Sequence, residues 1–158
     1  MKVVVRRKGM ILWSYILIKA SVGVIDMAHE LIPRSGKLPA ANEVVRLLAT
    51  EFAYVKADAA DGLRLAQERA DWIERSPARV FLGHQQEVLE CAAKLRTLQP
   101  GEALTIKFWD DPSAKRLTMV VLPGESIKFG YASKEDEVSS RELVERCAWA
   151  LDCEVIMI

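Results

Sequence analysis

The first 32 residues constrain the fold of this chain more than any other part. Three basic residues at positions 6–8 precede a nearly unbroken apolar run from Met10 to Met27. A helix needs about 20 apolar residues to cross a bilayer, so the run over 10–31 is long enough. Its basic start and its more acidic end also suit a membrane segment. Lys19 and Asp26 lie inside the run, however, and a charge near the centre of a bilayer costs several kcal/mol.

Two other structures fit the same segment. A secretory signal needs a basic start and a short apolar stretch, which residues 10–18 supply, but no small-residue cleavage site follows at the right place. Residues 2–7 and 11–18 are rich in β-branched and aromatic side chains, which is typical of strands or of one strand and a buried helix. A soluble core, a membrane association through residues 10–31 and a signal therefore remain as three interpretations. Lys19 and Asp26 favour the soluble core.

The composition is that of a folded domain. The chain has 158 residues, of which 51% are hydrophobic and 28% charged. A domain of this size buries enough surface to fold without a metal or a disulfide. The net charge is zero, which argues against a general polyanion binder and leaves room for a local basic patch. Cys91, Cys147 and Cys153 are an odd number without a disulfide framework, so we expect an intracellular, reducing compartment, with a Cys147–Cys153 bridge as the alternative.

One break divides the chain. Two prolines and a glycine within residues 33–39 cannot continue a helix. This break predicts an apolar N-terminal segment over residues 1–32, a linker over 33–41 and an α+β domain over 42–158.

Periodicity predicts the elements of that domain. Apolar residues at helical spacing predict helices over 43–54, 58–75 and about 84–98, the first capped by Asn42. The pattern then changes to alternation, which predicts strands over 103–109, 116–122 and 126–131 in a three-stranded antiparallel meander. Ser139 and Glu142 fit a capping box for a helix to about residue 151, followed by a strand over 154–158. We therefore expect an α+β fold, with the helices packed on one face of the sheet.

No motif in the sequence identifies a reaction. His29 lacks a second histidine four residues on, and the cysteines have no zinc-ligand spacing, so we predict no metal site. Phosphate-binding glycine loops are missing as well, and no cofactor is predicted. Asp110 and Asp111 are interpreted as part of an Asp-Pro turn. A small enzyme with a Cys/His site stays an alternative, and it requires a pocket with His84, His29 or a cysteine at its wall.

Aromatic and basic residues give two binding hypotheses. Strand alternation places Ile106 and Phe108 on one face and Lys107 and Trp109 on the other. Such a face can stack bases and contact phosphates of RNA or single-stranded DNA. The candidate nucleic-acid contacts are Lys107, Lys115, Arg116 and Lys128. The candidate residues of a protein interface are Trp13, Trp72, Trp109 and Trp149.

The absence of a catalytic constellation, the neutral charge and the four tryptophans favour a non-catalytic protein-interaction module or accessory subunit. Its partner is expected to be another protein or a second copy of the chain. RNA or single-stranded DNA binding through the sheet, and a small enzyme with a Cys/His site, are the alternatives.

Overall fold

The computed structural model describes residues 28–77, 81, 83–124, 126–131 and 133–157. These residues form helices and two three-stranded antiparallel sheets, which confirms the predicted α+β class. The expectations for residues 1–27, including Trp13 and the whole apolar run from Met10 to Met27, lie outside the described residues. No helix in the described ranges is long and apolar enough to span a membrane.

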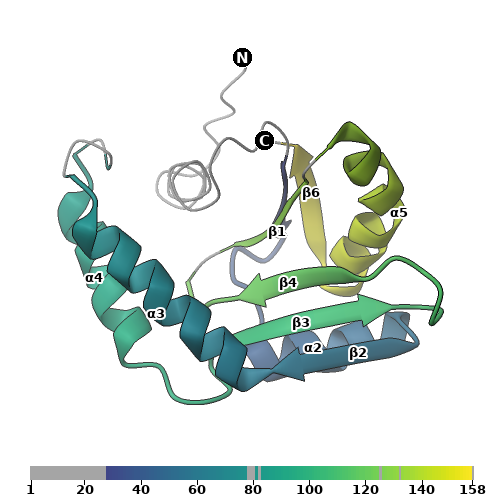
Figure 1. Ribbon diagram of the computed structural model, residues 1–158, viewed down its shortest axis with the longest axis horizontal. Coiled ribbons are helices and arrows are strands. Elements are labelled where there is room, and N and C mark those ends of the chain that lie inside the picture. Colours follow the sequence, from purple (N-terminus) through teal and green to yellow (C-terminus); the bar gives the residue numbers. More distant parts are fainter. Residues whose placement is uncertain (1–27, 78–80, 82, 125, 132, 158) are drawn as a thin grey trace.

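The two sheets are named here by their strands (Figure 1). Sheet A has the strand order β5-β1-β6, and sheet B has the order β2-β3-β4. The elements are, in chain order, β1 (Ala28–Pro33), α2 (Ala41–Glu51), β2 (Tyr54–Asp58), α3 (Ala59–Arg75), α4 (Gln85–Arg96), β3 (Leu104–Trp109), β4 (Leu117–Val121), β5 (Ile127–Gly130), α5 (Lys134–Ala150) and β6 (Cys153–Met157).

The predicted meander is only partly correct. β3 and β4 form the expected hairpin, with Leu104 opposite Val121 and Phe108 opposite Leu117. The third strand, β5, pairs with β1 in sheet A, where Leu31 lies opposite Ile127. Alternation of apolar residues shows which face of a strand is buried but not which strand lies next to it. The missing partner was β1, whose residues belonged to the apolar N-terminal segment.

Local capping explains where the helices begin. Asp58 accepts a hydrogen bond from the Asp61 N–H at 2.9 Å, so α3 begins where it was predicted. The predicted start of α5 was six residues too late, because Ser133 and not Ser139 caps the helix, accepting from the Asp136 N–H at 3.1 Å. The acidic residues over 135–137, which a helix starting at Ser139 would have excluded, occupy the first turn of α5, where the helix dipole favours them.

The first helix also differs from its prediction. Ala40, and not Asn42, is at the N-cap of α2, and its side chain makes no capping bond. The helix ends at Glu51, since Phe52 has an extended backbone with φ −109° and ψ 143°. The chain then continues into β2, a strand that the sequence pattern assigned partly to helix.

Two hydrophobic clusters hold these elements. The main cluster joins both sheets to α2 and α5, with Leu31, Leu48, Phe108 and Val144 among its fully buried members. The second cluster joins α3 and α4 to Phe81, Ala103 and Leu122. Figure 1 shows α2 behind sheet B, whereas α3 and α4 lie to the left of the sheet. The predicted single layer of helices is therefore realised only in part, because α3 and α4 form a separate hairpin with a core of its own.

Candidate functional site

The exposed side of sheet B carries aromatic and basic side chains. Ile106 and Phe108 are fully buried, whereas Lys107 is exposed and Trp109 is half-buried. The prediction that Ile106 and Phe108 lie on the buried face of β3, with Lys107 and Trp109 on the other face, is thus confirmed. The solvent side is called here the open face, and its residues are Tyr54, Lys56, Asp58, Lys107, Trp109, Arg116 and Thr118.

A stack of three side chains crosses the open face. Tyr54 on β2 lies directly opposite Trp109 on β3, with ring centroids 5.4 Å apart and ring planes 11° from parallel. The Arg116 guanidinium, just before β4, lies 4.4 Å from the centre of the Trp109 ring. Contacts of this kind are favourable cation–π interactions. Each of the three strands of sheet B therefore supplies or adjoins one member of the stack.

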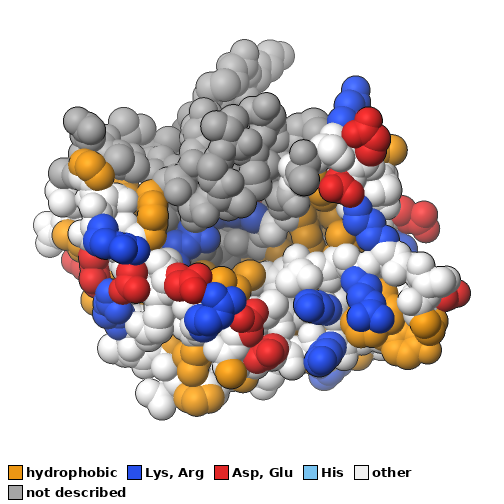
Figure 2. All heavy atoms as spheres, in the orientation of Figure 1, with side chains coloured by type: hydrophobic (Ala, Val, Ile, Leu, Met, Phe, Trp, Pro, Cys, Tyr) orange, Lys and Arg blue, Asp and Glu red, His pale blue; other side chains and the backbone are white. Residues whose placement is uncertain are grey.

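Two lysines lie next to the stack. Lys56 on β2 is directly opposite Lys107 on β3, and both side chains are exposed. Like charges directly opposite each other on neighbouring strands destabilise a sheet. Figure 2 shows Lys and Arg side chains gathered over the front of sheet B. The open face thus carries three cations, Lys56, Lys107 and Arg116, with Asp58 at one end and the carboxylate of Asp61 close enough to interact electrostatically with Lys107.

The structure brings together two of the four predicted nucleic-acid contacts, Lys107 and Arg116. Lys115 extends toward α5, where its ammonium group lies 3.0 Å from Asp136 Oδ1 and 2.9 Å from Ser139 Oγ. Lys128 is on β5 in sheet A. Lys115 and Lys128 therefore do not belong to the open face, because Lys115 contacts α5 and Lys128 lies in the other sheet.

Sequence reasoning missed Tyr54 and Lys56. Both lie in a segment that was predicted to be the end of one helix and the approach to the next. The available signal was the five-residue stretch Tyr54–Asp58, in which aromatic, β-branched and charged residues follow each other without helical spacing.

The predicted interface tryptophans have three different environments. Trp72 on α3 is half-buried, and its ring meets Phe81 edge to face with centroids 6.0 Å apart, so it belongs with the second cluster. Trp109 is part of the stack on the open face. Trp149 on α5 is 79% exposed. It is therefore the tryptophan, among the described ones, that the fold leaves to solvent.

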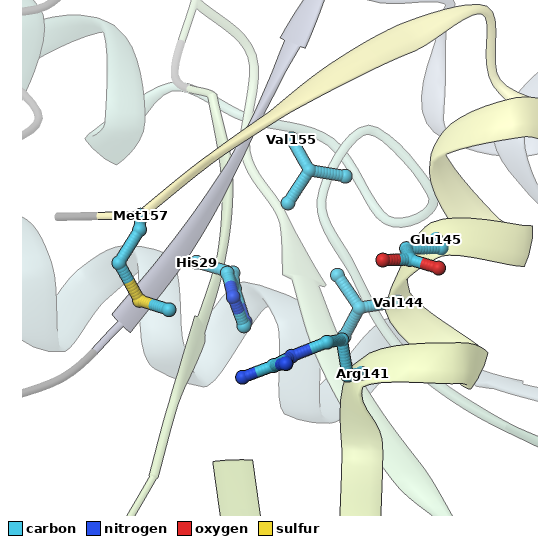
Figure 3. A pocket seen from close by; sticks show the side chains of 6 residues that line it. All are labelled: His29, Arg141, Val144, Glu145, Val155 and Met157. Carbon is cyan, nitrogen blue, oxygen red and sulfur yellow. The ribbon is translucent and has the colours of Figure 1, made fainter. Parts of the chain in front are cut away.

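A small pocket lies between α5 and the β1–β6 strands of sheet A (Figure 3). Its volume is about 260 Å³. The lining residues are His29, Arg141, Val144, Glu145, Val155 and Met157.

His29 lines this pocket together with two charged residues, Arg141 and Glu145, and is 4% exposed. Its Nδ1 lies 2.7 Å from the Tyr131 hydroxyl, and its Nε2 lies 3.5 Å from Glu137 Oε1. Arg141 in turn donates to both carboxylate oxygens of Glu137, at 2.8 and 3.0 Å. Burial lowers the pKa of His29 and raises the pKa of Tyr131, so both groups are neutral near pH 7. Because both ring nitrogens already face a partner, His29 is arranged as a link between β1 and α5.

None of the three cysteines lines the pocket of Figure 3. Cys147 and Cys153 are buried, and burial raises the pKa of both thiols, that of Cys153 to about 11. A thiol with a raised pKa is a poor nucleophile. The two cysteines are free, so the alternative of a bridge between them is not realised. His84 immediately precedes α4, 3.7 Å from Glu87, and does not line the pocket of Figure 3.

The two aspartates of the β3–β4 connection have structural partners. Asp110 accepts hydrogen bonds from Arg146, which also donates to Glu51 Oε1 at 2.9 Å. These bonds lower the pKa of Asp110. Asp111 accepts from the Ser113 N–H and hydroxyl, both at 2.8 Å, as in the predicted turn. No group of three or more potential metal ligands occurs in the described ranges.

Comparison with known proteins does not assign this chain to a family. No protein-family model, no curated protein and no solved structure matches it. The functional inference therefore depends on the open face and on the other surfaces described above.

Proposed function

We propose that this protein binds single-stranded nucleic acid, RNA or DNA, through the open face of sheet B. The observation that carries the proposal is the Tyr54–Trp109–Arg116 stack beside the opposed pair Lys56 and Lys107. Unpaired bases stack on aromatic rings and on guanidinium planes, while lysines meet the phosphates. The open face places both kinds of group on one surface.

The opposed lysines support an anionic ligand in particular. Side chains directly opposite on antiparallel strands have Cβ atoms about 5 Å apart, so two ammonium groups can contact one phosphate or two successive ones. A bound phosphate would replace their mutual repulsion with attraction. Lys107 is on the central strand of sheet B, where no edge needs protection against another sheet. The charge of Lys107 is therefore not explained by protection of a sheet edge.

The number of cations limits the affinity that we expect. Lys56, Lys107 and Arg116 can neutralise about three phosphates, and single strands lose affinity with a salt slope of about −0.7 per phosphate. We therefore expect a slope near −2 in a plot of log K against log salt. A duplex keeps its bases stacked on each other and should bind more weakly than a single strand.

Fluorescence anisotropy with labelled 12-nucleotide oligo(U) and oligo(dT) tests this proposal. Replacing Tyr54 by Ala should weaken binding about tenfold, since stacking of one base contributes about 1–3 kcal/mol. Lys107→Gln should weaken binding and reduce the salt slope by about 0.7. Lys94→Gln, an exposed lysine on α4, is the matched control and should change neither. Absence of binding at low salt, or an equal effect of Lys94→Gln and Lys107→Gln, would overturn the proposal.

The protein-interaction module expected from the sequence is a second proposal, and it depends on a different residue, Trp149. The enzyme alternative receives no comparable support, because the buried cysteines have raised pKa values and His29 is engaged at both ring nitrogens.

A further inference from the structure

The solvent side of α5 carries an unusual row of residues. Val138, Glu142, Glu145 and Trp149 follow each other at helical spacing, so they form one line along the helix. Val138 is 53% exposed and Trp149 is 79% exposed. These four residues are called here the α5 stripe.

The fold does not need the α5 stripe for its own core. The buried side of α5 is formed by Val144, Cys147 and Ala148, which belong to the main cluster. Trp149 is not part of this cluster, and most of its surface is exposed to solvent. A large exposed aromatic side chain is typical of a contact residue at a protein interface.

The charges on α5 also distinguish the stripe from the rest of the helix. Glu137 is paired with Arg141, and Arg146 is paired with Asp110 and Glu51. By contrast, Glu142 and Glu145 have no hydrogen bond or ion pair within 4 Å in the described ranges, although Glu145 borders the pocket of Figure 3 and its charge acts on Arg141 and His29. The stripe therefore combines an exposed indole ring with two carboxylates that lack a salt-bridge partner.

We infer that the α5 stripe is a docking surface for a basic segment of a protein partner. Charge complementarity favours this occupant. Arginine or lysine side chains of the partner would meet Glu142 and Glu145, and one cation would lie over the face of Trp149. Val138 provides an apolar contact at the far end. Nucleic acid does not fit this surface, because its phosphates would be repelled by both carboxylates.

This surface is chemically the opposite of the open face. The open face is basic and is proposed to bind an anionic ligand, whereas the α5 stripe is acidic and is proposed to bind a basic one. The two inferences depend on different residues, so either can fail without the other.

A synthetic probe tests the inference without knowledge of the natural partner. The probe is a fluorescein-labelled 16-residue helical peptide with arginine on one face and leucine beside it, and its control has glutamate in place of every arginine. The full chain should bind the arginine peptide and not the glutamate peptide. Trp149→Ala should weaken binding about tenfold or more, as for a central interface residue. Glu142→Gln and Glu145→Gln should weaken it about threefold each.

The matched control variant is Glu90→Gln, which removes an exposed carboxylate from α4 and should leave the affinity unchanged. All four substitutions are at exposed positions, so circular dichroism should show the same fold in each. Equal binding of the arginine peptide to the wild type and to Trp149→Ala would overturn the inference. So would light scattering that shows a dimer which Trp149→Ala converts to a monomer, because a second copy would then cover the stripe.

Discussion

Gly62 is where α3 approaches β3 most closely. A Cβ atom at this position would lie 2.5 Å from the Ala103 carbonyl carbon and 2.7 Å from Leu104 Cα, both of them backbone atoms that cannot move aside easily. In an open helix, Gly→Ala would stabilise by about 1 kcal/mol. Here the overpacking should dominate, and Gly62→Ala should lower the free energy of unfolding by about 2 kcal/mol. Urea denaturation measures this difference, with Glu68→Ala on the exposed side of α3 as a control that should change it by less than about 0.5 kcal/mol. A more stable Gly62→Ala variant would show that α3 can move away from β3.

His29 should make the stability depend on pH. Burial lowers its pKa from the ordinary value of 6.5, Glu137 and Glu145 act to raise it, and Arg141 acts to lower it. Because the folded pKa is depressed, the unfolded chain binds the proton first. The stability is therefore complete above about pH 6.5, falls as the pH decreases below that value, and stops falling below the folded pKa.

The variant His29→Gln should lose this dependence. Its free energy of unfolding should change less between pH 7.5 and pH 5 than that of the wild type, as measured by urea titration at both pH values. A proton NMR titration of the His29 ring gives the folded pKa directly. His84→Gln is the matched variant for comparison, since it removes the histidine that precedes α4. If the wild type and His29→Gln had the same dependence of stability on pH, His29 would not be its cause.

At the scale of elements, the sequence was informative where local chemistry decides the structure. Asp58 and the helical spacing that follows it identify α3, and the turn residues around Asp111 identify the β3–β4 hairpin. Partners of strands are decided by contacts between distant residues, such as Leu31 with Ile127. Nothing near β5 in the sequence indicates that its neighbour comes from residues 28–33.

The candidate site was also predictable only where local sequence decides the structure. Alternation within β3 was enough to place Lys107 and Trp109 on one face. Tyr54 and Lys56 could not be added, because β2 is five residues long and joins directly to two helices. A strand so short carries too few alternating positions to outweigh the helical spacing on either side.

The pairing of β2 with β3 gives a prediction about the opposed lysines. If Lys56 and Lys107 repel each other, Lys107→Thr should raise the free energy of unfolding by about 0.5 kcal/mol while it weakens oligonucleotide binding. Threonine also favours strands, so a double-mutant cycle is needed to separate the two effects. After Lys107→Thr, the further change Lys56→Thr should stabilise less than it does alone. Strict additivity of the two substitutions in urea denaturation would show that the lysines do not interact.

At the scale of the whole molecule, the two hydrophobic clusters suggest two units of different stability. The second cluster is built mainly from α3 and α4, and it meets sheet B through Ala103, Leu122 and the half-buried Val120. The main cluster instead joins elements from both ends of the described chain, from Leu31 to Cys153. We therefore expect the α3–α4 hairpin to open locally without unfolding of the two sheets.

Leu95→Ala tests this division, because Leu95 is 1% exposed in the second cluster. The cavity should cost about 2–5 kcal/mol, and amide hydrogen exchange should accelerate in α3 and α4 far more than in β3, α2 or α5. Leu48→Ala, a substitution at a fully buried residue of the main cluster, should accelerate exchange throughout the molecule. Oligonucleotide binding at the open face should persist in Leu95→Ala, since Tyr54, Trp109 and Arg116 do not belong to the second cluster. Uniform acceleration by both variants would mean that the two clusters unfold as one unit, and the open face would then depend on the α3–α4 hairpin as well.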